Sequence, residues 1–190
     1  AAAVSWRTGD GAAIGGAPAV ALATTSRWMS KAWPQAQWVE LARHLLAAGP
    51  EHLLLLGAPS EQAEVEALRA AIDGPPDRVH NLAGRTSVGE MMAAIESCSL
   101  VVSNDSAALH MAVGLAHRGV RCVGLFGPTD PAKVGPYRMD EVVVRAPLPD
   151  NQAVNYRDQS LGDSIMRTIA VADVLEKIES VRAMPGIDTP

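Results

Sequence analysis

The chain has 190 residues, which is enough for one well-packed domain and marginal for two. Hydrophobic residues make up 48% of it, so a core can form, while a formal net charge of −5 argues against nucleic acid as a partner. The longest apolar runs fall short of the ~20 residues that span a bilayer, so no transmembrane segment is predicted.

The ends of the chain differ in composition from its middle. Residues 1–18 are rich in Gly and Ala, begin without Met and show no sustained period, which predicts a linker or the remnant of a preceding domain. Residues 183–190 are interpreted as a tail. We therefore expect one folded domain over residues 19–182, cut from a longer protein.

Six short segments predict strands. They cover residues 19–24, 52–56, 78–82, 100–103, 121–126 and 141–144. Most of them are rich in apolar residues without alternation, which is typical of a parallel sheet that is covered on both faces.

Helical patterns separate most of these runs. The predicted helices run from Pro34 to Gly49, from a Ser60 cap through Ile72, from Ser87 through Ile95, from an Asp105 or Ser106 cap through Leu115, and over residues 169–181. Ser87 and Glu90 have the spacing of a capping box. The alternation of strands and helices predicts an α/β fold: a Rossmann-like parallel sheet with helices on both faces.

Ligands of such sheets bind outside the carboxyl ends of the strands, so the loops there are the candidate site. Their polar groups are hydroxyls, one lysine, carboxylates and helix N-termini, a combination that suits an anionic ligand. The candidates are Thr24, Thr25, Ser26, Lys31, Glu61, Arg85, Thr86, Asp105, Ser106, Ala107, His110 and Thr129.

Each candidate also has a purely structural interpretation. Asp105 and Ser106 are preferred helix caps, and Glu61 is favoured by the dipole in the first turn of a helix. Lys31 could be a solvated surface lysine, and His110 could pack inside the domain. The Gly-Pro-Thr-Asp-Pro turn over residues 127–131 could be only a tight connection.

Several common sites are absent from the sequence. It contains no GxGxxG fingerprint, no GxxxxGK[ST] phosphate loop and no GxSxG nucleophile elbow. The acidic residues Asp77, Asp130 and Asp150 are isolated, and Cys98 and Cys122 lie outside any CxxC or Cys/His cluster. No metal site is predicted, and the cysteines are interpreted as buried residues in a reducing compartment.

Taken together, the loop motifs resemble the C-terminal domain of the ADP-heptose:lipopolysaccharide heptosyltransferases, glycosyltransferase family 9. The matching segments are Trp-Met-Ser-Lys-Ala-Trp-Pro (28–34), Leu-Gly-Ala-Pro-Ser-Glu (56–61), Asn-Leu-Ala-Gly-Arg-Thr-Ser (81–87), Val-Ser-Asn-Asp-Ser (102–106) with His110, and Leu-Phe-Gly-Pro-Thr-Asp-Pro (125–131). They occur in family order over about residues 20–137.

The resemblance implies one half of a GT-B glycosyltransferase, the half that holds the nucleotide sugar. Lys31 and the loop from Thr24 to Ser26 would face the diphosphate, and Glu61 would take the ribose. The Arg85-Thr86 backbone would meet the base. Asp105, Ser106 and the amides that follow would hold the phosphates and the sugar, with His110 behind them.

The resemblance also implies partners and a place in the cell. The donor would be ADP-heptose, and a lipid-linked saccharide of the lipopolysaccharide core would be the acceptor, held by an N-terminal domain outside this sequence. No metal or other cofactor is implied, because helix ends, lysine and hydroxyls would stabilise the leaving diphosphate. The protein would be cytoplasmic or peripheral at the inner face of the inner membrane.

Two departures from the family pattern bear on function. Ala107 replaces the usual Gly, and its Cβ would hinder a φ > 0 conformation or a close phosphate, although in a first helical turn it is harmless. The stretch from Pro147 to Met166 lacks the cysteines of many members.

In this family the general base belongs to the N-terminal domain, so we expect this chain to bind nucleotide without turnover. A transferase for another nucleotide sugar and a non-catalytic nucleotide-binding scaffold remain alternatives.

Overall fold

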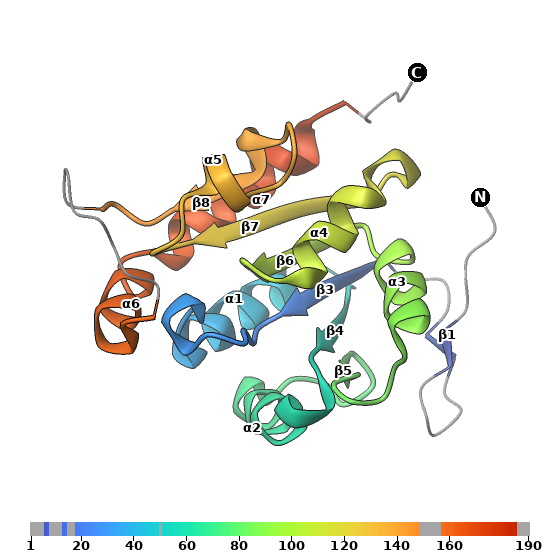
Figure 1. The fold of residues 1–190 in the computed structure, drawn as a ribbon. Helices are drawn as coiled ribbons and strands as arrows, with labels where there is room; N and C mark the ends of the chain where they lie inside the picture. The colour runs from blue at the N-terminus through green and yellow to red at the C-terminus, as the bar shows by residue number, and fades with distance from the viewer. Residues whose placement is uncertain (1–5, 8–12, 15–17, 50, 149–156, 186–190) are drawn as a thin grey trace.

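The structure is a computed structural model that describes residues 6–7, 13–14, 18–49, 51–148 and 157–185 (Figure 1). Its main feature is a six-stranded sheet in which all pairs are parallel. The strands are β3 (Ala19–Ala23), β4 (His52–Leu56), β5 (Val79–Asn81), β6 (Leu100–Asn104), β7 (Arg121–Phe126) and β8 (Val143–Arg145). The predicted Rossmann-like α/β sheet is confirmed.

The strand order is β5-β4-β3-β6-β7-β8, so the chain builds outward from β3 in both directions. It first adds β4 and β5 on one side of β3, and then crosses to add β6, β7 and β8 on the other side. The direction of winding reverses between β3 and β6. In open α/β sheets this reversal leaves a crevice at the carboxyl ends of the two central strands.

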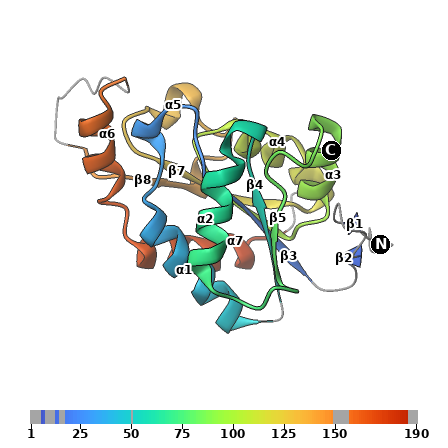
Figure 2. The same cartoon turned by 90° about the horizontal axis from the view of Figure 1, so that it is seen from below.

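Helices cover both faces of this sheet (Figures 1 and 2). On one face lie α1 (Gln35–Ala48), α2 (Gln62–Ile72) and α7 (Val171–Ala183), and on the other α3 (Val88–Glu96) and α4 (Ala107–Gly114). The predicted stripe of α1 is buried at Trp38, Leu41, Ala42 and Leu45. Burial of β3 and β6 along their whole length explains their apolar sequences.

Trp33 and Trp38 anchor α1 to the last helix. Their rings meet edge to face with centroids 5.0 Å apart, and the Trp33 Nε1–H donates to the Ile169 carbonyl at 3.0 Å. Gln37 Nε2 donates to the same carbonyl at 2.7 Å. Ile169 thus serves as an acceptor just before α7, which begins at Val171 rather than at the predicted residue 169.

The predicted Ser60 cap is wrong. Pro59 begins a 3-10 turn, η2 (Pro59–Glu61), so α2 starts at Gln62 and Ser60 makes no cap bond. Ser106, one of the two residues predicted to cap α4, does hold the N-cap position, but its side chain makes no capping bond, and Asp105 bonds elsewhere. The capping box before α3 is confirmed, because Glu90 Oε2 accepts the Ser87 N–H at 2.7 Å and Ser87 Oγ accepts the Glu90 N–H at 3.3 Å.

Several short elements were not predicted from the sequence. They are β1 (Trp6–Arg7), β2 (Ala13–Ile14), η1 (Met29–Lys31), η3 (Ala116–Arg118), α5 (Pro131–Val134), η4 (Asp140–Val142) and α6 (Gln159–Met166). β1 and β2 pair antiparallel within the expected linker of residues 1–18. Apart from these two strands and Pro18, the linker lies outside the described residues. Asp158 caps α6 by accepting the Leu161 N–H at 3.1 Å, and Gly162 packs directly on Ser30 of η1.

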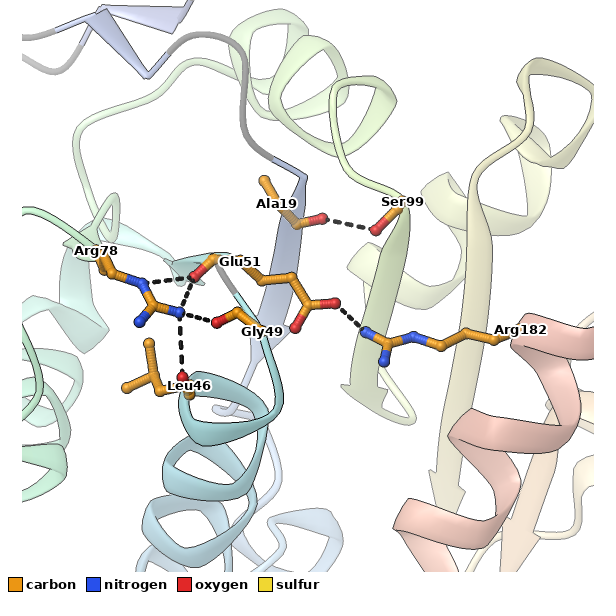
Figure 3. A network of polar contacts seen from close by, with 7 residues as sticks. All are labelled: Ala19, Leu46, Gly49, Glu51, Arg78, Ser99 and Arg182. Atoms are coloured by element: carbon orange, nitrogen blue, oxygen red, sulfur yellow. Dashed lines mark hydrogen bonds and ion pairs between the residues drawn. The ribbon is translucent and has the colours of Figure 1, made fainter.

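A network of charged side chains closes the amino edge of the sheet (Figure 3). The Arg78 guanidinium donates to the carbonyls of Leu46, Gly49 and Glu51, where α1 ends and β4 begins. The Glu51 carboxylate pairs with Arg182 of α7 at 2.5 Å. The network thus ties the turn after α1 to β5 on one side and to α7 on the other.

Candidate functional site

A cavity of about 460 Å³ opens at the carboxyl edge of the sheet. Its walls come from the loops that follow β3, β4, β5 and β6 and from the first turns of α3 and α4. It therefore lies at the reversal between β3 and β6, the place where the topology predicts a ligand.

The structure brings seven of the twelve predicted residues to the wall of this cavity. They are Thr25, Ser26, Glu61, Thr86, Asp105, Ser106 and Ala107. They come from four different loops, so their convergence is a property of the fold and not of one local motif.

Asp105 connects two of the remaining residues to the cavity. It is only 8% exposed, and its Oδ2 accepts hydrogen bonds from Lys31 Nζ at 2.6 Å and from Thr129 Oγ1 at 2.9 Å. Lys31 and Thr129 do not line the cavity themselves. Asp105 is therefore held by side chains from the loops after β3 and β7, and the predicted capping role is replaced by this ion pair.

Asn104, fully buried at the end of β6, fixes the loop after β3. Its Nδ2 donates to the Thr24 carbonyl at 2.8 Å, and its Oδ1 accepts the Trp33 N–H at 3.1 Å. Thr24 thus contributes its backbone to the scaffold behind Thr25. The sequence signal for Asn104 was an amide at the end of an apolar run, where a buried polar group requires partners.

The start of α4 presents a hydroxyl and backbone amides to the cavity. Ser103 Oγ and Ser106 Oγ are 2.9 Å apart, and Ser103 Oγ donates to the Asn104 carbonyl at 2.7 Å. Ala107 is the first residue of the helix and does not have a positive φ. Ala107 therefore lies in a first helical turn, and the backbone here takes no left-handed conformation.

Arg85 and His110 are not brought to the cavity. Both side chains are exposed and neither lines its wall. His110 lies on the outer side of α4, so packing inside the domain, the alternative for this residue, is wrong. Arg85 lies on the loop after β5, next to Thr86, which does line the cavity.

The sequence did not predict the apolar wall of the cavity or some of the residues at its edge. Leu56, Pro59, Val88 and Met91 give the cavity an apolar side, and Arg27 and Trp28 lie at its edge. Trp28 is 40% exposed, with the Arg157 guanidinium 6.0 Å from its ring centroid. Trp28, Leu56 and Pro59 lie in the quoted motifs, while Arg27, Val88 and Met91 lie outside them, and only the fold places all six together.

The wall after β5 depends on one glycine. Gly84 has φ +68°, and a Cβ placed there would lie 2.9 Å from Pro59 Cα. Both the positive φ and the close approach to Pro59 require glycine at this position. Gly84 therefore allows the loop carrying Thr86 to pack against the loop carrying Glu61.

The site combines an apolar wall with a polar end. The apolar side suits a flat ring system, while hydroxyls, backbone amides and carboxylates at the other end suit phosphates and sugar hydroxyls. Within the part of the chain that the structure describes, no group of three or more His, Cys, Asp or Glu side chains could hold a metal ion. None of the described helices is long and apolar enough to cross a bilayer.

A doubly wound parallel sheet with a cavity at its reversal point defines a Rossmann-like α/β domain with a candidate ligand site. The family model of glycosyltransferase family 9 (heptosyltransferase) matches residues 6–162. The chain belongs to this family.

Three similar proteins support the assignment. The lipopolysaccharide heptosyltransferase 2 of Salmonella typhimurium is 28% identical over 159 residues, 83% of this chain and 44% of the relative. The structure of E. coli ADP-heptose lps heptosyltransferase II superposes with a TM-score of 0.70 at 22% identity, covering 87% of this chain and 46% of that one. E. coli heptosyltransferase WaaC, solved with ADP, gives a TM-score of 0.67 at 23% identity, covering 86% and 44%.

The matched region spans less than half the length of each of these three proteins. The two structural likenesses establish the fold, which is that of one half of a GT-B glycosyltransferase.

Proposed function

We propose that this chain is the donor-binding part of a glycosyltransferase that transfers heptose from ADP-heptose to a lipopolysaccharide core acceptor. The observation that carries the proposal is the convergence of Thr25, Ser26, Glu61, Thr86 and Ser106 on one cavity at the sheet reversal. Membership of the heptosyltransferase family and the ADP-bound state of the similar WaaC structure support the choice of donor.

The proposal places one part of the donor against each wall of the cavity. The apolar side formed by Leu56, Val88 and Met91 would receive the adenine, close to the backbone of Thr86. Glu61 Oε2 already accepts the Ala58 N–H at 2.6 Å, so its carboxylate is held in place while Oε1 would accept a ribose hydroxyl. Arg85 would act here only through its backbone.

The diphosphate would lie between the loop after β3 and the start of α4. Hydroxyls of Thr25, Ser26 and Ser106 and the first amides of α4 would donate to its oxygens, with the helix dipole adding favourable potential. As the bond from the sugar to the phosphate breaks, negative charge grows on the leaving ADP, and these donors would stabilise it without a metal ion. Lys31 would add positive charge from behind Asp105.

The acceptor and the general base would come from outside these residues. We propose that the isolated chain binds nucleotide but does not transfer heptose, and that the whole enzyme works at the cytoplasmic face of the inner membrane. Incubating the chain with ADP-heptose and a core acceptor should give no product. Heptosyl transfer by the chain alone would contradict the division of roles.

Calorimetric titration of ADP, UDP and GDP into the chain tests the donor assignment. We expect ADP to bind most tightly, with an affinity unchanged by EDTA. Preference for UDP or GDP would point to another nucleotide sugar. Absence of binding by all three would reject the proposal in favour of a non-catalytic scaffold.

A further inference from the structure

Asp105 receives two hydrogen-bond donors on a single oxygen. Lys31 Nζ at 2.6 Å and Thr129 Oγ1 at 2.9 Å both bind Oδ2. Within the described part of the chain, Oδ1 accepts no hydrogen bond, yet Asp105 lines the cavity. The carboxylate is thus anchored through one oxygen, and its other oxygen has no hydrogen-bond donor among the described residues.

The two donors differ in how firmly they fix the carboxylate. A lysine ammonium is a point charge on a flexible stem and can follow a carboxylate that rotates about its Cβ–Cγ bond. That rotation is otherwise broad, because the torsion has no sharp staggered minima. Thr129 is β-branched and buried at 8% exposure, so its hydroxyl donates from a fixed point and defines the rotation.

We propose that Thr129 is a positioning residue for sugar recognition. Its hydroxyl holds Asp105 Oδ2 so that Oδ1 faces the cavity and accepts a hydroxyl group of the donor sugar. A carboxylate oxygen repels phosphate and attracts O–H donors, so the effect of Thr129 falls on the sugar and not on the diphosphate. The inference rests on the proposed donor-binding function. Thr129 would not contact the ligand itself but would act on it by orienting the Asp105 carboxylate.

Thr129→Val removes the hydroxyl and keeps the shape of the side chain. We expect it to weaken binding of ADP-heptose about tenfold, as loss of an oriented charged hydrogen bond would, while ADP binding changes less than about twofold. Thr129→Ser keeps the hydroxyl and should restore the affinity for ADP-heptose. If the valine variant folds poorly, Thr129→Ala takes its place, because it puts no second methyl group beside the carboxylate. It should show the same selective loss of ADP-heptose affinity.

A double-mutant cycle with Asp105→Asn separates action through Asp105 from direct contact. In the Asp105→Asn background, Thr129→Val should have no further effect on ADP-heptose affinity, because the carboxylate that Thr129 positions is gone. Additive losses, or equal losses for ADP and ADP-heptose, would overturn the proposal. Wild-type chain that binds neither compound would instead reject the donor-binding function itself, and this inference with it.

Discussion

The two edges of the sheet use charged side chains in opposite ways. At the amino edge, Arg78 donates to three backbone carbonyls and Glu51 pairs with Arg182, so the network is directed at the fold itself (Figure 3). At the carboxyl edge, Lys31 and Thr129 hold one oxygen of Asp105, whose side chain lines the cavity. A network directed at the backbone stabilises the fold, while the contacts at the cavity would serve recognition under the proposed function.

This contrast predicts that the amino edge affects stability and the carboxyl edge affects binding. Substitutions at the first should lower the free energy of unfolding and leave nucleotide affinity unchanged. Substitutions at the second should change affinity by more than they change stability.

The largest effect is expected for Arg78→Ala. The variant leaves the carbonyls at the end of α1 without their donor, and charged hydrogen bonds of this kind are worth about 1.5–3 kcal/mol. We expect a loss of about 3 kcal/mol in the free energy of unfolding, measured by urea titration. Arg118→Ala is the control, because its 3.5 Å pair with Glu96 is exposed and contributes about 0.5 kcal/mol or less. Equal losses of unfolding free energy in the two variants would contradict the structural role of Arg78.

Lys31→Ala tests the carboxyl edge. The variant removes a partner of Asp105 and the charge beside the proposed diphosphate site, so ADP affinity should fall about tenfold, which corresponds to about 1.4 kcal/mol. Calorimetry gives the dissociation constant, and urea titration gives the accompanying loss of stability, which should be smaller. Lys177→Ala is the matched control, since among the described residues its ammonium donates to the backbone carbonyl of Glu141, a contact at the surface. An unchanged ADP affinity in Lys31→Ala would show that this lysine has a purely structural role.

Gly84→Ala tests the wall between the loops after β4 and β5. The positive φ and the close Pro59 Cα should lower the free energy of unfolding by about 1–2 kcal/mol. Gly89→Ala is the control, because Gly89 lies in α3 with open space around it and should gain about 0.5 kcal/mol from helix propensity. Thermal or urea unfolding of both variants checks the sign, and a stabilised Gly84→Ala would show that this loop does not need glycine.

The smallest effect concerns the cysteines, which take part in neither of these two networks. Burial raises the pKa of the Cys98 and Cys122 thiols to about 12, so both stay protonated at pH 8. Iodoacetamide at pH 8 should therefore leave the folded chain unmodified and alkylate both cysteines in urea, as mass spectrometry would show. Fast modification of the folded chain would contradict their burial.

The sequence was sufficient to predict most of the sheet. Continuous apolar runs such as 52–56 and 121–126 can be buried only in covered strands, and the structure places β4 and β7 on these residues. Prediction failed where a local signal competed with a partner distant in sequence. Asp105 has the character of a cap, but its carboxylate meets Lys31, which lies 74 residues earlier.

The candidate site was predictable in its loops but not in its surfaces. Thr25, Glu61 and Thr86 could be grouped because carboxyl ends of parallel strands share an edge. Nothing in the sequence separated Thr86, which lines the cavity, from Arg85, which is exposed beside it, because that depends on backbone direction in one loop. The apolar wall of Val88 and Met91 appears only once α3 is placed.

An NMR titration of the chain with ADP tests the central claim most directly. If the carboxyl edge binds the nucleotide, backbone amide shifts should appear at Thr25, Ser26, Thr86 and Ser106. The amides of Glu51, Arg78 and Arg182 at the opposite edge should not move. Shifts centred on the amino edge, or no shifts at saturating ADP, would contradict the account.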